Sequence, residues 1–413
     1  MPLYSPNSVE RIVIELTANC NAMCPGCDRW NKGDGGLNAV VEQHLGRAGH
    51  MTLRKFNNAI HNDLFLHHPE FRTIEFNGSV GDAILHPLFI NFIKLVNKKN
   101  DQFRKENSKE NPRVRLKLAT NAGLHGKKFW TEVAKQFIAS GRHQNHLIMV
   151  ALDGTTNETH QQYRRGVDFN KALTNARTLI DNGAKVRWQF IEFAHNKHQI
   201  EEAKELAKKY GFQDIEVRNS RGENSIYGDW VSSIKEAKAY QAPKIELLKK
   251  DAKVEKPQKT RVEKKINTKL ERKIEYKVTP ELEELIKETE KIKDVEKFIN
   301  ETPIYCDWGN KGSINIEFNG TVHPCCHMNQ GMFYPNNDKN KYYHEVNALY
   351  DSGWNNLENY NLVQILNHTY FKKDLEDSWK PDTDPDKKFK RLTPCLELCS
   401  RKRKDNDEVT DIS

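Results

Sequence analysis

The stretch Arg11-Ile-Val-Ile-Glu-Leu16 is followed closely by Cys20-Asn-Ala-Met-Cys24-Pro-Gly-Cys27. The apolar run is typical of a buried strand, and the cysteines lie on the loop after it with the spacing Cys-x3-Cys-x2-Cys. Three thiolates on one short loop can hold three irons of a cubane cluster and leave the fourth iron open to a small molecule. The alternative is part of a zinc site, but zinc prefers four nitrogen or sulfur ligands. No fourth ligand is obvious nearby, since the nearest downstream histidines are His44 and His50. The spacing therefore favours an iron–sulfur cluster over a zinc site.

This cysteine pattern, and its position after a first strand, resemble those of the radical SAM enzymes. The resemblance implies a [4Fe–4S] cluster on Cys20, Cys24 and Cys27. It implies that the open iron of this cluster binds the amino and carboxylate groups of S-adenosylmethionine and delivers the electron that cleaves it. Active sites on barrels of this kind gather at the carboxyl ends of the strands, where the cysteine loop is expected.

The bulk composition is that of a folded protein with a polar insertion. The chain has 413 residues, of which 37% are hydrophobic and 30% charged, which allows two or three domains. We expect a cytoplasmic protein without a membrane partner, because no apolar stretch is long enough to span a bilayer and no signal-peptide pattern is present. In a reducing compartment the eight cysteines indicate metal ligands in preference to disulfides. The net charge of +8 comes from basic residues interleaved with acidic ones, which argues against nucleic acid as a partner.

Short β-rich runs alternate with helical patterns in the first half of the chain. The expected strands are 11–16, 72–76, 114–119, 147–152, 185–191 and 214–217. The expected helices are 52–66, 88–99, 127–140, 170–183 and 197–211, with Gly183 and Gly211 where glycines end helices. Such βα units predict parallel strands joined by right-handed crossovers. The predicted fold class is α/β. The resemblance to the radical SAM enzymes implies a partial (β/α)6 TIM-like barrel, then a charged linker and a small Cys-rich α+β auxiliary-cluster domain.

The predicted domains are a core barrel at 8–220, a charged linker at 221–300 and the auxiliary-cluster domain at 301–402. Lysine and glutamate dominate the linker and aromatic residues are nearly absent from it, as in a solvated connection between folded units. In the last segment, a strand at 313–318 leads through the turn signal Asn319-Gly320 into a second short strand.

The second and third expected strands end in motifs that resemble the S-adenosylmethionine-binding motifs of the family. Gly81-Asp82, followed by Leu85-His86-Pro87, is similar to the Gly-Gly-Glu-Pro motif that contacts the amino group of the bound methionine, with Asp-Ala where Glu-Pro is commoner. Glycine there would let a ligand approach the backbone. Thr120 and Asn121 resemble the Thr-Asn-Gly segment near the adenosine, and an ordinary turn is the alternative.

The fourth and fifth strands supply further candidates. Asp153 lies in Ala151-Leu-Asp-Gly154, where many family members carry Ser-x-Asp-Gly. It is a candidate catalytic or substrate-binding residue, with capping of the next helix as the alternative. By the same resemblance Arg164, with Arg165 as its rival, pairs with the carboxylate of S-adenosylmethionine, a task that suits a guanidinium. Gln189 is a candidate inward-facing polar residue.

The remaining cysteines form a second cluster pattern. Cys306-x13-Gly320-x4-Cys325 resembles the opening of the SPASM and twitch auxiliary-cluster domains, in which a hairpin brings its two cysteines together. Cys395 and Cys399 can complete four ligands for a second, auxiliary [4Fe–4S] cluster. The longer cysteine run of a full SPASM domain is absent, which favours a single cluster of twitch type. Cys326, next to Cys325, is a spare thiol: a buried bystander, a ligand in place of Cys325, or a redox or substrate group. For the domain as a whole, a zinc ribbon is the alternative.

The resemblance implies an enzyme that forms a 5′-deoxyadenosyl radical and abstracts hydrogen from a peptide or protein, with flavodoxin or ferredoxin as electron donor. The alternative enzyme dehydrogenates or rearranges a small molecule such as an aminoglycoside or nucleotide. A zinc-stabilised nucleic-acid-binding protein is the alternative from another class, and the interleaved acids and βα pattern have no place in it.

Overall fold

A computed structural model describes residues 2–27, 29, 46–108, 113–140, 146–219, 303–329, 350, 353–381, 391–392, 395 and 399. The predicted linker at 221–300 and His44 lie outside these residues. Among the described helices, none has the length and apolar character needed to cross a bilayer.

The described strands form one sheet in the order β6-β5-β4-β3-β2-β1-β7-β8. Neighbours from β6 to β7 are parallel, and β8 pairs with β7 in the antiparallel sense. The bounds are β1 Arg11–Ile14, β2 Thr73–Phe76, β3 Arg115–Thr120, β4 Leu147–Ala151, β5 Val186–Glu192, β6 Asp214–Asn219, β7 Ser313–Ile316 and β8 Val322–His323. All six predicted barrel strands are confirmed, and the open parallel sheet is the expected partial barrel.

One feature of the sheet was not predicted: β7 pairs with β1 in parallel, with Ile14 beside Ile316. The hairpin that carries the C-terminal cysteines therefore continues the barrel sheet past β1. Gly320, in the turn of this hairpin, has a φ of +90°, a conformation that glycine adopts without strain. The sheet crosses the predicted domain boundaries, which remain predictions.

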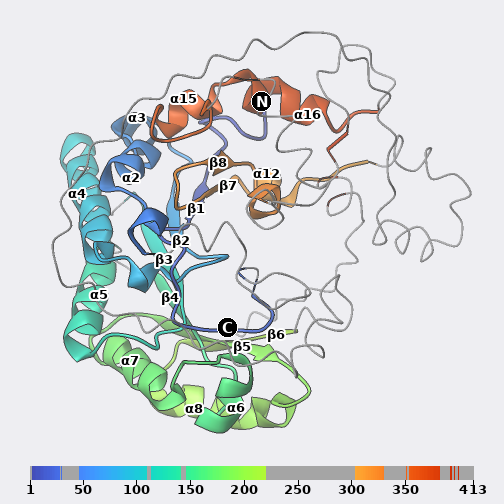
Figure 1. Cartoon of the computed structure of the whole chain (residues 1–413). Coiled ribbons are helices and arrows are strands. Elements are labelled where there is room, and N and C mark those ends of the chain that lie inside the picture. Colours follow the sequence, from blue (N-terminus) through green and yellow to red (C-terminus); the bar gives the residue numbers. More distant parts are fainter. Residues whose placement is uncertain are drawn as a thin grey trace, which may run out of the picture.

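Helices cover the outer face of the parallel strands (Figure 1). Their bounds are α2 Leu53–Ala59, α3 Asn62–His67, α4 Phe89–Asn107, α5 Lys127–Ser140, α6 Asn157–Tyr163, α7 Phe169–Asp181 and α8 Ile200–Tyr210. The predicted helix at 52–66 is two helices, because His61 is an N-cap and accepts a hydrogen bond from the backbone N–H of Asp63. Helix α6 was not predicted. Gly183 and Gly211 have φ of +87° and +78°, as expected for residues that end helices.

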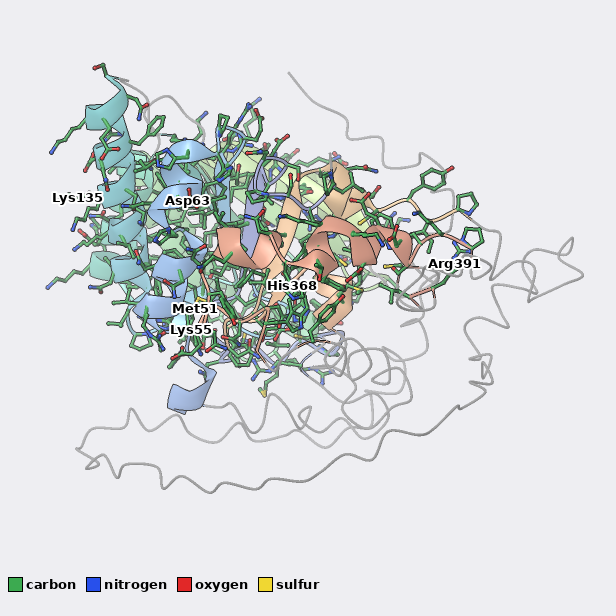
Figure 2. All side chains as sticks on the ribbon, turned by 90° about the horizontal axis from the view of Figure 1, so that it is seen from above. Met51, Lys55, Asp63, Lys135, His368 and Arg391 are labelled. Atoms are coloured by element: carbon green, nitrogen blue, oxygen red, sulfur yellow. The ribbon has the colours of Figure 1, made fainter. Side chains whose placement is uncertain are left out.

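The core lies between the sheet and these helices. Ile12 and Ile14 of β1, Leu116 and Leu118 of β3, and Trp188 of β5 are fully buried. Alternate residues of each strand point to this core, so the intervening residues line the opposite, concave face of the sheet. In Figure 2, Lys135 of α5 projects from the outer side of the helical layer, at the opposite end of the molecule from Arg391.

The C-terminal segment adds short helices around the β7–β8 hairpin. They are α12 Asp307–Asn310, α15 Leu362–Leu366 and α16 Leu375–Asp377, with the π-helix η7 Tyr370–Asp374 before α16. Asn58 of α2 donates to the carbonyl of Leu357 (2.8 Å), and Arg54 forms an ion pair with Glu358. The C-terminal segment therefore packs directly on the first helices of the barrel.

Candidate functional site

The cysteine loop after β1 is held by backbone from other strand ends. The N–H of Asp82, after β2, donates to the carbonyl of Asn19 (2.9 Å). The N–H of Met23 donates to the carbonyl of Arg165, after α6 (2.8 Å). The Cys27 thiol donates to the carbonyl of Ser79 at 3.6 Å. The loop thus lies at the carboxyl ends of the strands, as expected.

Asp82 ties the ends of β2 and β3 together beneath this loop. Its carboxylate is buried and accepts hydrogen bonds from the Thr120 hydroxyl (2.9 Å) and the Asn121 N–H (2.8 Å). Burial raises the pKa of Asp82, although these hydrogen bonds act in the opposite direction. Both candidate segments, after β2 and after β3, are therefore brought together around one carboxylate.

The glycine of this motif has a structural cause of its own. A Cβ on Gly81 would lie 1.9 Å from the carbonyl oxygen of Thr17 and 3.0 Å from that of Asn19. Only glycine fits there, because the backbone of the cysteine loop passes against it. The chain's own packing thus explains a residue that the sequence suggested for ligand approach.

Asn121 and Arg29 lie beside Cys20. The Asn121 amide donates to Asn21 at 2.9 Å and reaches the Cys20 sulfur at 3.8 Å. Burial raises the pKa of Cys20 to about 12, while the Arg29 guanidinium acts to lower it. Arg29 is itself buried and donates to the Val80 carbonyl (3.0 Å). It was not predicted as a site residue, since it comes after the cysteine motif and no spacing rule marks it.

Arg164 lies at the second thiol, in an ion pair with Asp153. Its Nη1 lies 3.7 Å from the Cys24 sulfur, and its Nε donates to Asp153 at 2.6 Å. Asp153 is fully buried and also accepts a hydrogen bond from the N–H of Ile191 (2.7 Å). Burial lowers the pKa of Arg164, but Asp153 and Cys24 outweigh it and raise the pKa well above its usual value. Asp153 thus orients Arg164, and Thr156, not Asp153, is the N-cap of α6.

Gln189 of β5 lies apart from the cysteine contacts described above. Its amide donates to Glu216 of β6 at 3.2 Å and contacts the sulfur of Met149 of β4 at 3.5 Å. Arg187 pairs with Asp214 (2.6 Å) on the same face. The residue does line the concave face, as expected, within a polar network between neighbouring strands.

A pocket gathers the four C-terminal cysteines that the sequence assigned to an auxiliary cluster. It encloses about 290 Å³, counting the part open to solvent. Its lining consists of Cys306, Pro324, Cys325, His327, Met328, Leu375, Trp379, Cys395 and Cys399. Burial raises the pKa of Cys325, and the neighbouring thiols Cys395, Cys326 and Cys306 raise it further. Cys326 begins the short 3-10 helix η5 (Cys326–Asn329) and does not line the pocket.

The donor sets match the ligand chemistry of iron–sulfur clusters. Thiolates are the usual ligands of such clusters, three for a cubane with an open iron and four for a fully coordinated one. Among the described residues, no three or more His, Cys, Asp or Glu side chains are placed to hold a single metal ion. The cysteines of both sets are free of disulfides.

Comparison with known proteins gives distant structural likenesses. No family model and no curated protein matches the chain. It is similar to the structure of anSMEcpe with bound AdoMet (S-adenosylmethionine), with 12% identity, a TM-score of 0.47, and coverage of 90% of this chain and 81% of that chain. It is similar to Streptococcus suis SuiB bound to the precursor peptide SuiA, with 13% identity, a TM-score of 0.41, and coverage of 94% and 76%. For methylornithine synthase (PylB) the identity is 10%, the TM-score 0.33, and the coverage 51% and 53%.

These scores and identities carry no activity over to this chain. Its own features are a mostly parallel sheet open at both edges in the described residues, a Cys-x3-Cys-x2-Cys loop after β1, and a four-cysteine pocket next to the β7–β8 hairpin. In the order and placement of these features, the chain resembles the radical SAM enzymes with a C-terminal SPASM- or twitch-type auxiliary-cluster domain.

Proposed function

We propose that this chain is a radical SAM enzyme that abstracts hydrogen from a peptide or protein substrate and thereby oxidises or cross-links it. The observation that carries the proposal is the surroundings of the cysteine loop. Groups that follow three different strands contact its thiols: Asn121 donates to Cys20 and Arg164 to Cys24, while the Ser79 carbonyl accepts a hydrogen bond from Cys27. These contacts lie at the carboxyl ends of parallel strands, which is where folds of this kind have their active sites.

Cys20, Cys24 and Cys27 would hold the first cluster. When bound, this cluster supplies the electron that splits S-adenosylmethionine into methionine and a 5′-deoxyadenosyl radical. Arg29 and Arg164 place two cations beside these thiols, which favours their thiolate forms and offsets the negative charge of a thiolate-bound cluster.

Arg164 is the proposed partner of the methionine carboxylate. Its guanidinium has five donors; Nε is used on Asp153 and one N–H of Nη1 on Cys24, so that the other Nη donors remain for a second carboxylate. Asp153 acts as the positioning residue that holds this orientation. The rest of the proposed S-adenosylmethionine-binding edge consists of Gly81, Asp82, Thr120 and Asn121. Gln189 is proposed to line the concave face of the sheet at β5.

Cys306, Cys325, Cys395 and Cys399 would hold the second cluster. Burial and neighbouring thiols raise the pKa of Cys325 and Cys395, so their thiolate forms are costly, and a cationic metal centre in the pocket offsets that cost. This cluster would accept the electron left after hydrogen abstraction or anchor the substrate. Flavodoxin or ferredoxin is the proposed electron donor to the enzyme.

The test is the content of iron, sulfide and zinc per chain after anaerobic reconstitution. We expect about eight irons with matching sulfide, since each cubane holds about four. Incubation with dithionite and S-adenosylmethionine should then release 5′-deoxyadenosine. The Cys326→Ala variant should keep the same iron content, because this thiol lies next to Cys325 but outside the pocket lining.

The other outcomes separate the alternatives. About four irons would confine the cluster chemistry to one site. Zinc without iron would contradict the proposal of a radical SAM enzyme and favour a zinc-stabilised nucleic-acid-binding protein. Release of 5′-deoxyadenosine that responds to added aminoglycosides or nucleotides, and not to peptides, would favour the small-molecule alternative.

A further inference from the structure

The N-terminal segment of the chain reaches the C-terminal cysteine pocket. Figure 1 shows the N-terminus beside α15 and α16. The N–H of Leu3 donates to Glu376 of α16 at 2.7 Å, and the ring centroid of Tyr4 lies 6.0 Å from that of Phe371. Tyr4 is only 1% exposed. The segment that precedes the barrel therefore packs against η7 and α16, next to the auxiliary site.

The buried end of Tyr4 contacts one of the four cysteines directly. Its hydroxyl oxygen lies 3.0 Å from the Cys306 sulfur, although the two residues are 302 positions apart in the sequence. The N–H of Gly309 reaches the same sulfur at 3.4 Å. A Cβ on Gly309 would lie 3.1 Å from the Tyr4 ring, so the absence of a side chain at this position lets the ring pack closely against the backbone.

The chemistry of the two groups decides the direction of this hydrogen bond. A thiolate that ligates iron has no proton and can only accept, whereas a phenol can donate its O–H. Burying a tyrosine hydroxyl without a partner is costly, so buried tyrosine hydroxyls usually find an acceptor. In the loaded protein, Tyr4 would donate to the sulfur of a cluster ligand.

We propose that Tyr4 tunes the reduction potential of the auxiliary cluster through this hydrogen bond to Cys306, an inference that rests on the proposed function. Hydrogen bonds to ligand sulfurs are among the factors that set the potentials of iron–sulfur clusters. The donated proton draws negative charge away from the sulfur and so favours the reduced, more negative cluster. Tyr4 holds the potential above the value that the same four cysteines would give without it.

The test compares Tyr4→Phe with the parent in full-length protein that carries Cys20, Cys24 and Cys27 as alanine, so that only the auxiliary cluster reports. The measurement is an anaerobic redox titration followed by electron paramagnetic resonance, with iron counted on every sample. Phenylalanine keeps the ring packing on Phe371 and removes only the hydroxyl. Tyr350→Phe is the matched control, because its hydroxyl donates to Asp374 (2.5 Å) in the same part of the fold.

We expect Tyr4→Phe to retain about four irons and to shift the potential to a more negative value, with an altered resonance spectrum. Tyr350→Phe should leave both unchanged. An unchanged potential in Tyr4→Phe, or an equal shift in both variants, would overturn the proposal. So would loss of iron in Tyr4→Phe alone, which would make Tyr4 a structural support of the pocket. If the parent with the three alanines binds zinc or no metal, the proposed function fails at this site before Tyr4 is tested.

Discussion

The Asp153–Arg164 ion pair offers a quantitative test of the site. Asp153 is fully buried, the Arg164 side chain is 17% exposed, and their atoms lie 2.6 Å apart. Replacing Asp153 with asparagine keeps an oxygen for the N–H of Ile191 but removes the charge that compensates the guanidinium. Truncating one member of a buried pair costs about 3–5 kcal/mol. Because asparagine keeps one of the hydrogen bonds, we expect a loss of about 3 kcal/mol in the free energy of unfolding.

The assay is urea unfolding of the reduced, metal-free protein, followed by tryptophan fluorescence. Asp181→Asn is the matched control. Asp181 pairs with Arg177 at 2.9 Å, but its side chain is 58% exposed. Solvent screens such a surface pair, so we expect a loss of no more than about 1 kcal/mol from this variant.

Asp153→Asn should also weaken the binding of S-adenosylmethionine to the reconstituted enzyme, because Arg164 loses its fixed orientation. Equilibrium dialysis measures this binding. A loss of stability equal to that of Asp181→Asn would refute the reasoning. It would mean that the buried carboxylate does not support Arg164 and is available for direct contact with the substrate.

Three further predictions concern the two cysteine sets and one buried histidine. Asn121→Asp places a carboxylate beside Cys20, which disfavours the thiolate, so the iron content should fall from about eight toward about four per chain. Cys395→Ala removes one of four pocket ligands and should also leave about four irons, with 5′-deoxyadenosine still released; full loss of release would contradict it. Burial lowers the pKa of His146 to about 4, below the roughly 6.5 of an unfolded histidine. As the pH falls below about 6.5, the unfolded chain takes up a proton that the folded chain refuses, and stability is lost until the pH reaches the folded pKa. At pH 5 this amounts to about 2 kcal/mol, so the stability of His146→Gln should depend less steeply on pH in this range, and an unchanged slope would count against it.

The positions of the six barrel strands along the sequence were predictable from local patterns. Strands such as β1 and β4 show up as short apolar runs, and helices such as α5 and α8 show apolar residues at helical spacing, because each pattern depends only on neighbouring residues. Helix α6 was missed, since its sequence, Asn157–Tyr163, is polar throughout and presents no apolar stripe. The start of α3 at His61 was missed because histidine is not among the usual N-cap residues.

The cysteine spacings and the glycines that end α7 and α8 were determined by the sequence alone, because ligand number and a positive φ are properties of a few adjacent residues. The tertiary structure alone decided that β7 extends the sheet beside β1, that Asp153 forms an ion pair with Arg164, and that the Tyr4 hydroxyl contacts the Cys306 sulfur. Asp153 and Arg164 are 11 residues apart, but the β1–β7 and Tyr4–Cys306 contacts join residues 302 positions apart, and no local periodicity encodes their register. They are set by the packing of whole elements, which brings together groups that the sequence keeps far apart.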